Sequence, residues 1–391
     1  MSLSPQLESS IAAEYSGEPL GLYLHAPFCR ARCSYCSFAS CTDILLEPLY
    51  ISRLLGDIAQ MGRLLKRPKL ETLYWGGGTP SVLSLESLNA VSRAIHGEFD
   101  ASDLAEATIE ANPGTLNPAW LYAARSCGWD RISLGVQSLD DDQLTRLGRI
   151  HNSAQGLEAI ATCKNAGFTR ISADLLLGAP GQPPGRALDD ARRLVKAGTE
   201  HLSIYMLDLD KECPLKSQVE NGSIELPDEG LVADAYLALS ESLPNLGLAH
   251  YEISNFAFPG RESAHNCRYW LKLPYLGLGP SAASNIGNIR WIEDESPTEW
   301  IKGQTEHEVS ILSPKESLAE IGMLGLRMNQ GINWKELRRR ASALELADLV
   351  DDWETELEPI FGRGLLQRDG ESLRLTTKGM LLSNQVLMVF A

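Results

Sequence analysis

Short β-type runs and helical patterns alternate along most of this 391-residue chain, and this alternation leaves few folds open. Strand-like runs, each ending in a polar or glycine-rich turn, are expected at 20–26, 71–75, 106–110, 131–136, 170–177 and 201–207. Apolar residues at helical spacing indicate helices over 46–65, 84–96, 154–166 and 187–197. Strands that alternate with helices predict parallel βαβ units in series, and hence an α/β fold with a partial or complete (β/α) barrel.

The pattern changes after about residue 311. Helices are expected over 313–328, 334–344 and 346–361, followed by a hairpin over 364–375 that turns at Asp369-Gly370. Helices with a small hairpin predict a mostly helical, winged-helix-like C-terminal domain. We therefore expect an N-terminal extension (1–19), a barrel region that handles cofactor and substrate (20–310) and a C-terminal domain (311–391).

Composition and charge narrow the function class. With 44% hydrophobic and 22% charged residues, the chain can bury a substantial core. The formal net charge of -16 argues against a nucleic-acid partner, because neutralising phosphates requires dense Lys and Arg. Apolar runs such as 175–177 are too short to cross a bilayer, which leaves peripheral membrane contact open. Residues 1–21 contain no basic segment followed by an apolar core, so we expect reduced thiols and a cytoplasmic location.

Three cysteines follow the first expected strand in one short loop. Cys29, Cys33 and Cys36 have the spacing C-x3-C-x2-C. Thiolates hold iron–sulfur clusters, usually four per cubane, so three clustered thiolates predict a cluster with one iron that lacks a protein ligand. A zinc site with Cys41 and His25 as further ligands, or a catalytic thiol, is the alternative. Barrel chemistry sits on the loops after the strands, where this loop lies.

Polar residues also mark the ends of the following strands. The run Gly76-Gly77-Gly78-Thr79-Pro80 closes the second strand, and consecutive glycines let a backbone approach a ligand closely. Glu110, Gln137 and Asp174 stand in or beside otherwise apolar strands, where burial is costly without partners. Solvent exposure or an arginine partner can explain any one of them. Together they offer acceptors for an amine and for ribose hydroxyls, as an adenosyl amino acid requires.

In their order and spacing, these motifs resemble the radical S-adenosylmethionine (SAM) superfamily. Within it they are similar to the branch that contains oxygen-independent coproporphyrinogen III oxidase and the HemW-type heme chaperones. The resemblance covers nearly the whole chain and rests on these runs: Tyr23 to Cys29, the cysteine triad, Gly76 to Pro80, Glu110 to Pro113, Gly135 to Ser138, Asp174-Leu175 and Gly178 to Pro180. It implies a barrel of the radical SAM type.

The resemblance also implies a role for each matching residue. Cys29, Cys33 and Cys36 would ligate three irons of a 4Fe–4S cluster, and SAM would chelate the open iron through its amino and carboxylate groups. Tyr23 would lie beside the cluster and cofactor. The remaining SAM contacts would come from Gly77, Gly78, Thr79, Glu110, Gln137, Arg149 and Asp174. Low-potential electron delivery to the sulfonium would then release a 5′-deoxyadenosyl radical.

Two departures favour the HemW-type branch over the oxidases. Phe38 stands where oxidases of this family carry a fourth cysteine, and only 28 residues precede Cys29, where those enzymes have a longer extension. The segment 265–270 is similar to an H-N-x-x-Y-W pattern associated with heme handling in HemW-type proteins. Histidine nitrogen and thiolate are both competent heme ligands, so His265 and Cys267 are the candidates. Hydrogen-bonded packing of the histidine and burial of the cysteine are the alternative roles.

The leading hypothesis is a heme chaperone that binds heme as cargo and passes it to an acceptor protein. The alternatives are radical decarboxylation of coproporphyrinogen III in porphyrin biosynthesis and a radical SAM methyltransferase. Phe38 and the short extension argue against the decarboxylation, while other chemistry of the cofactor stays open. The expected partners are heme, a heme-acceptor protein and an electron donor, with no nucleic acid. The role of Cys41 is left undecided.

Overall fold

In the computed structural model, six parallel strands in chain order form the centre of a large sheet. The structure describes residues 3–303 and 307–391, so parts of the predicted extension (1–2) and barrel region (304–306) lie outside the described residues. The six strands are β1 (Leu20–Ala26), β2 (Leu70–Gly77), β3 (Glu106–Ala111), β4 (Arg131–Gln137), β5 (Arg170–Leu177) and β6 (His201–Met206). Each coincides with a strand predicted from the sequence, to within two residues at either end.

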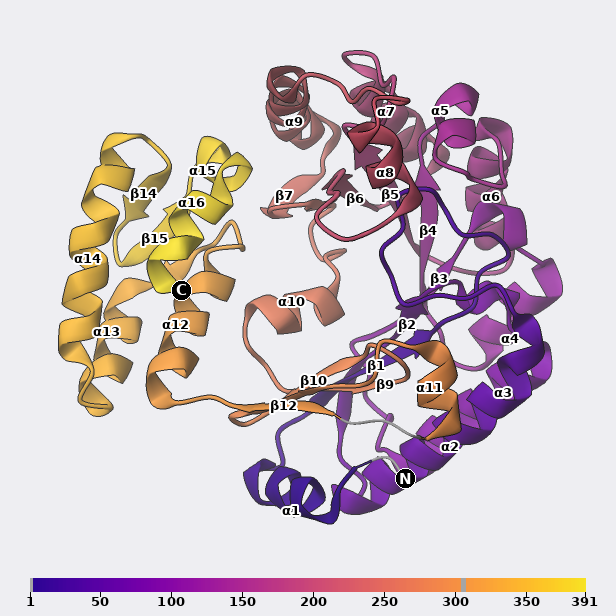
Figure 1. Ribbon diagram of the computed structural model, residues 1–391, viewed down its shortest axis with the longest axis horizontal. Coiled ribbons are helices and arrows are strands. Elements are labelled where there is room, and N and C mark those ends of the chain that lie inside the picture. Colours follow the sequence, from indigo (N-terminus) through magenta and orange to yellow (C-terminus); the bar gives the residue numbers. More distant parts are fainter. Residues whose placement is uncertain (1–2, 304–306) are drawn as a thin grey trace.

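Helices connect these strands and cover the outer side of the sheet, as Figure 1 shows for α2 to α7. They are α2 (Glu47–Leu64), α3 (Leu85–Glu98), α4 (Pro118–Ser126), α5 (Asp141–Arg146), α6 (Ser153–Asn165) and α7 (Arg186–Ala197). Two further helices, α8 (Pro214–Glu220) and α9 (Glu229–Ser242), follow β6. Apolar residues at helical spacing, such as Leu54, Ile58 and Met61 of α2, are buried against the sheet. The four helices predicted from that spacing are confirmed.

The barrel is partial, because the sheet does not close. Within the described residues, β1 pairs with β9 (Tyr275–Leu278) and β6 pairs with β8 (Asn255–Ala257), so β1 and β6 are not neighbours. The 12-stranded sheet ends at β7 (Ala249–Glu252) on one side. On the other side it runs through β10 (Ala283–Ile286) and β11 (Ile289–Ile292) to β12 (Glu308–Ile311). Sequence reasoning missed these added strands because each has four residues or fewer.

The C-terminal part folds as predicted into helices and a small hairpin. Its elements are α12 (Pro314–Gly325), β13 (Ile332–Asn333), α13 (Trp334–Ala343), α14 (Ala347–Gly362), β14 (Leu366–Asp369), β15 (Ser372–Leu375), α15 (Thr377–Leu381) and α16 (Ser383–Leu387). The hairpin turns at Gly370, and β13 adds a third strand. These elements confirm a mostly helical, winged-helix-like domain. The boundaries proposed at 19/20 and 310/311 stay a prediction.

The remaining short elements connect or flank these parts. They are the helices α1 (Pro5–Glu14), α10 (Ala264–Trp270) and α11 (Pro297–Lys302), and the 3-10 helices η1 (Ile44–Leu46), η2 (Pro80–Val82), η3 (Pro113–Thr115), η4 (Leu243–Leu246) and η5 (Met388–Phe390). Helix α10 contacts both β2 and α12, and Figure 1 shows it between the sheet and the C-terminal domain. It therefore lies where the two parts of the molecule meet.

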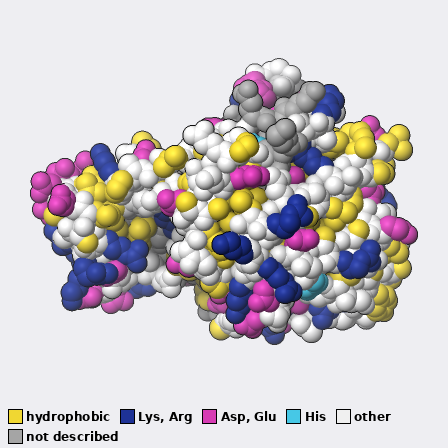
Figure 2. All heavy atoms as spheres, turned by 90° about the horizontal axis from the view of Figure 1, so that it is seen from below, with side chains coloured by type: hydrophobic (Ala, Val, Ile, Leu, Met, Phe, Trp, Pro, Cys, Tyr) yellow, Lys and Arg dark blue, Asp and Glu magenta, His cyan; other side chains and the backbone are white. Residues whose placement is uncertain are grey.

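The surface carries mixed charge. Figure 2 shows Lys and Arg side chains interspersed with acidic and apolar ones on one face of the molecule. None of the helices in the described part of the chain has the length and apolar character needed to span a membrane.

Candidate functional site

A cavity of about 290 Å³ lies at the carboxyl ends of the central strands and gathers most of the predicted site residues. Its wall includes the three thiols of the cysteine loop and the glycine turn after β2. The predicted residues that line it are Cys29, Cys33, Cys36, Gly77, Gly78, Glu110, Gln137, Arg149 and Asp174. Parallel strands bring residues from distant parts of the sequence to one edge of the sheet, which is why these side chains meet.

Backbone hydrogen bonds hold the cysteine loop in place. The amide of Cys29 donates to the carbonyl of Cys41 over 2.9 Å, and the amide of Cys41 donates to Pro27 over 2.7 Å. Farther along, the amide of Ser34 donates to Leu147 over 3.1 Å. Cys41 thus supports the loop through its main chain. All eight cysteines are free thiols.

The alternative zinc site at His25 and Cys41 fits the structure poorly. His25 Nε2 lies 2.9 Å from the carbonyl oxygen of Ala39, which can only accept, so Nε2 carries the proton. His25 Nδ1 then accepts from the Tyr23 hydroxyl over 3.1 Å. Burial lowers the pKa of His25 to about 4. Both ring nitrogens are therefore engaged. No group of three or more His, Cys, Asp or Glu side chains within residues 3–303 and 307–391 is placed to hold a single metal ion.

Arg149 connects the thiols with the strand ends. Its guanidinium donates to Cys33 Sγ over 3.1 Å, to Asn112 Oδ1 and to the carbonyl oxygen of Gly135. Burial raises the pKa of Cys29 to about 11, whereas the hydrogen bond from Thr79 and the charge of Arg149 act in the opposite direction. A fixed positive charge at this position favours the thiolate form that a metal or cluster requires.

The glycine turn leaves no room for side chains. At Gly77, φ is +100° and a Cβ atom would lie 2.5 Å from the His25 ring. At Gly78, a Cβ atom would lie 2.7 Å from the carbonyl oxygens of Ala26 and Phe28. Both glycines also line the cavity, and the amide of Gly77 donates to Glu110 Oε2 over 3.1 Å.

Two partly buried carboxyl groups face the cavity. Glu110 Oε1 accepts from the Tyr74 hydroxyl over 2.6 Å, and Asp174 Oδ1 accepts from the Ser133 hydroxyl over 3.3 Å. Burial raises the pKa of Glu110 to about 7, and the nearby Asp174 adds to that rise. Burial likewise raises the pKa of Asp174 to about 6. Perturbed carboxyl groups in a cleft are typical of functional sites.

Gln137 has a strained backbone at the end of β4. Its φ is +68°, and the pairing of β4 with β5 is irregular between Leu134 and Gln137. A residue other than glycine, asparagine or aspartate is uncommon at such an angle, and strain of this kind concentrates at functional sites. The Gln137 side chain lines the cavity.

Two predicted residues lie behind the cavity wall, outside its described lining. Tyr23 packs against the Tyr74 ring with a centroid distance of 6.0 Å. Thr79 Oγ1 lies 3.6 Å from Cys29 Sγ and accepts from Asn112 Nδ2 over 2.7 Å. Both support residues that do line the cavity.

Sequence reasoning missed several residues of the wall. They are Tyr74, Thr108, Asn112, Arg131, Ser133, Ser172, His201, Ser203, Tyr205, Ser263 and Asn266. Most occupy alternate positions of β3 to β6, because side chains of a strand point to its two faces in turn. Taking every second residue along the strand from Glu110, Gln137 and Asp174 would have identified the missed wall residues of β3, β4 and β5.

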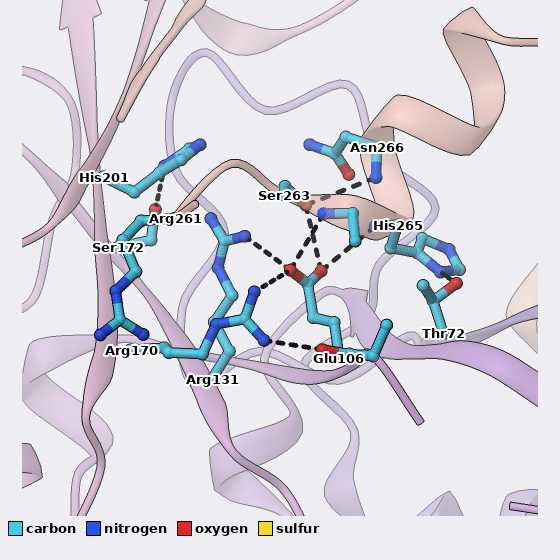
Figure 3. Close-up of polar contacts among 12 residues, drawn as sticks. Thr72, Glu106, Arg131, Arg170, Ser172, His201, Arg261, Ser263, His265 and Asn266 are labelled. Carbon is cyan, nitrogen blue, oxygen red and sulfur yellow. Dashed lines mark hydrogen bonds and ion pairs between the residues drawn. The ribbon is translucent and has the colours of Figure 1, made fainter. Parts of the chain in front are cut away.

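The two candidate heme ligands lie on α10. His265 is buried; its Nδ1 lies 2.8 Å from Thr72 Oγ1, and its Nε2 lies 2.8 Å from the hydroxyl of Tyr269 (Figure 3 shows the contact with Thr72). Burial lowers the pKa of His265 to about 3. Cys267 packs beside Tyr251, and burial raises its pKa to about 12. A ligand role for His265 requires one of its hydrogen bonds to be exchanged, so both assignments stay predictions.

Comparison with known proteins places the chain in a family. Residues 23–210 match the radical SAM superfamily and residues 312–382 match the HemN C-terminal domain. The "Heme chaperone HemW" of Lactococcus lactis is 32% identical over 95% of this chain and 97% of its own length. The chain belongs to the HemW family of radical SAM proteins. Membership of the radical SAM superfamily implies a 4Fe–4S cluster and SAM.

HemW relatives occur in several organisms. The Mycobacterium tuberculosis heme chaperone HemW is 31% identical over 96% of this chain and 95% of its own length. A mitochondrial radical SAM domain-containing protein 1 of Bos taurus is 33% identical over 94% of this chain and 86% of its own length. The structure of coproporphyrinogen III oxidase from Escherichia coli aligns with a TM-score of 0.86 over 99% of this chain and 93% of that chain. At 22% identity, this alignment shows that the chain shares the fold of that enzyme.

Proposed function

We propose that this protein is a heme chaperone, which binds heme and transfers it to an acceptor protein. The observation that carries the proposal is its similarity, over nearly its full length, to relatives named heme chaperone HemW. Phe38 supports it: this side chain is 64% exposed at the cavity, at the position where the oxidases of the family carry a fourth cysteine.

In this proposal Cys29, Cys33 and Cys36 ligate a 4Fe–4S cluster. The residues fit such a group, because three thiols line one cavity beside the Arg149 guanidinium. Arg149 Nε is buried and has no hydrogen-bond partner within the described residues, so it retains a donor for a further acceptor. When bound, the cluster and SAM supply one-electron chemistry at low potential, for which an electron donor is the expected partner.

The bare backbone at Gly77 and Gly78 gives the methionine part of SAM a close approach. Glu110 holds its amine, and Gln137, Arg149 and Asp174 contact its other polar parts or the ribose. Tyr23 and Thr79 act indirectly: Tyr23 orients His25 and Tyr74, and Thr79 supports Cys29.

Heme as cargo is assigned to α10. His265 Nε2 and the Cys267 thiol are the candidate iron ligands, and the neighbouring Tyr269 and Trp270 can flank a flat macrocycle. The hydroxyl of Tyr269 would have to release Nε2 before the nitrogen could bind iron.

Heme titration of the anaerobically reconstituted protein tests the function. We expect a Soret band and near-stoichiometric retention of heme after gel filtration, followed by its transfer to an added apo-acceptor. His265→Ala should shift or remove the band, while His96→Ala, at an exposed histidine on α3, should not. Absence of retained heme would contradict the chaperone. Formation of protoporphyrinogen from coproporphyrinogen III would favour the oxidase, and a methylated product would favour the methyltransferase.

SAM affinity should fall as the pH is lowered from about 8 to about 6. The ionised form of Glu110 is the stronger acceptor for a hydrogen bond from the amino group of SAM, and burial raises the pKa of Glu110 to about 7. Below that pH the carboxyl group is protonated and the stronger acceptor is lost. Equilibrium dialysis across this range measures the effect. Glu110→Gln should bind SAM more weakly, and its SAM affinity should depend less on pH. The remaining pH dependence would come from Asp174, whose pKa burial raises to about 6. An unchanged slope in Glu110→Gln would exclude Glu110 as the titrating group.

A further inference from the structure

The start of α10 is bound to the carboxylate of Glu106 on β3 (Figure 3). Glu106 is fully buried and accepts from the amide of Ala264 over 3.0 Å, the amide of His265 over 3.3 Å and the hydroxyl of Ser263 over 3.2 Å. Burial raises the pKa of Glu106, but the guanidinium groups of Arg131 and Arg170 more than offset this and hold it below its ordinary value. An ionised, paired carboxylate therefore anchors the first turn of α10.

A second connection runs from α10 through β2. His265 meets Thr72 over 2.8 Å, and its ring packs against the Tyr74 ring with a centroid distance of 5.2 Å and an interplanar angle of 32°. Thr72 and Tyr74 are two positions apart on β2, so both side chains point to the same face of the sheet. Thr72 reaches α10, whereas the Tyr74 hydroxyl reaches Glu110 in the cavity over 2.6 Å.

Tyr74 thus bridges the cavity carboxyl group and the buried histidine of α10. We propose that Tyr74 couples ligand binding at Glu110 to the order of α10, so that SAM and heme bind cooperatively. The inference rests on the proposed function, because it assumes that heme binds at α10 and the amine of SAM at Glu110.

The coupling follows from the chemistry of the Tyr74–Glu110 hydrogen bond. Near neutral pH, Glu110 is divided between its protonated and ionised forms, because burial raises its pKa to about 7. An amino group that donates a hydrogen bond to the carboxyl group favours its ionised form. A hydroxyl donates about twice as strongly to a carboxylate as to a neutral acceptor, so the bond from Tyr74 tightens. The ring is then held more firmly against His265, and α10 loses mobility.

A ligand that requires an ordered α10 has less conformational entropy to lose once the helix is already held. Binding of SAM should therefore raise the affinity for heme. Linkage requires the reverse effect to be of equal size, so heme should raise the affinity for SAM by the same factor.

Hydrogen exchange and heme titration on the cluster-loaded protein test this coupling. Added SAM should slow exchange of the α10 amides (264–270) and leave those of α13 unchanged. Heme affinity should rise at least about fivefold when SAM is present. In Tyr74→Phe this ratio should fall to one. In Tyr122→Phe, which removes an exposed hydroxyl on α4 that donates to Asn165, the ratio should keep its wild-type value.

The outcomes separate the coupling from the function on which it rests. A merely structural role for Tyr74 would weaken heme binding equally with and without SAM and preserve the ratio, which would overturn the coupling. The coupling would also be overturned if the wild type bound heme equally well with and without SAM, or if SAM left hydrogen exchange of the α10 amides unchanged. Both measurements use the wild type, so they apply even if Tyr74→Phe does not fold. Failure of the wild type to retain heme would instead overturn the proposed function.

Discussion

Replacing Cys33 with alanine is expected to abolish assembly of a normal 4Fe–4S cluster. Cys33 Sγ lines the cavity with the other two thiols and accepts a hydrogen bond from Arg149 over 3.1 Å. Three thiolates already leave one iron without a protein ligand, so loss of a further ligand leaves two irons open. After anaerobic reconstitution, iron and acid-labile sulfide should fall from about four per chain to well below one, and the brown colour should be lost.

Thiols elsewhere in the chain provide the matched controls. Cys127 is also partly buried, but it lies outside the cavity and contacts Asn89 over 3.3 Å. Cys127→Ala, Cys163→Ala and Cys213→Ala should retain full iron and sulfide. Equal losses in all four variants would show that the cysteine loop has no special role. Cys41 supports the loop through backbone atoms that an alanine also has, so Cys41→Ala separates a thiol ligand from a structural residue.

Alternation of strands and helices allowed the sequence to predict the central sheet and the location of its chemistry. The runs at 20–26 and 170–177 are flanked by turns and helical spacing, so their bounds agree with β1 and β5. The cysteine loop follows β1, which placed it at the active edge of a parallel sheet. The added strands β7 to β12 were not predicted, because short strands of this length carry too few residues to show a period.

Within the site, contacts between residues that are far apart in the sequence could not be predicted. Glu110, Gln137 and Asp174 stood out as polar side chains in apolar strands, and all three face the cavity. One partner of His265 is Thr72, which is 193 residues away, and nothing in the local sequence of either residue indicates the pair. The local sequence around Glu106 likewise gives no sign of its contacts with α10 and two arginines.

Glu106→Ala should destabilise the protein strongly. Glu106 is 0% exposed; it pairs with Arg131 over 2.9 Å and with Arg170 over 3.2 Å, and the Arg131 side chain is only 4% exposed. Removing one partner of a buried ion pair leaves the other charge uncompensated, which costs about 3–5 kcal/mol. The amides at the start of α10 also lose their acceptor. Urea unfolding should show a clear fall in the transition midpoint with little change in slope.

The variant Glu106→Gln separates charge from hydrogen bonding, because it keeps an acceptor for α10 but removes the carboxylate. Its urea midpoint should lie between those of the wild type and Glu106→Ala. Asp103→Ala is the matched control, since its exposed ion pair with Lys69 should contribute nothing measurable. The arginines lower the pKa of Glu106 in the folded state. The carboxylate therefore stabilises the fold fully at a pH above its pKa in the unfolded chain, and this stabilisation is lost as the pH falls through its pKa in the folded protein. The midpoints of wild type and Glu106→Gln should therefore converge in acid, and a difference that persists there would rule out charge as its source.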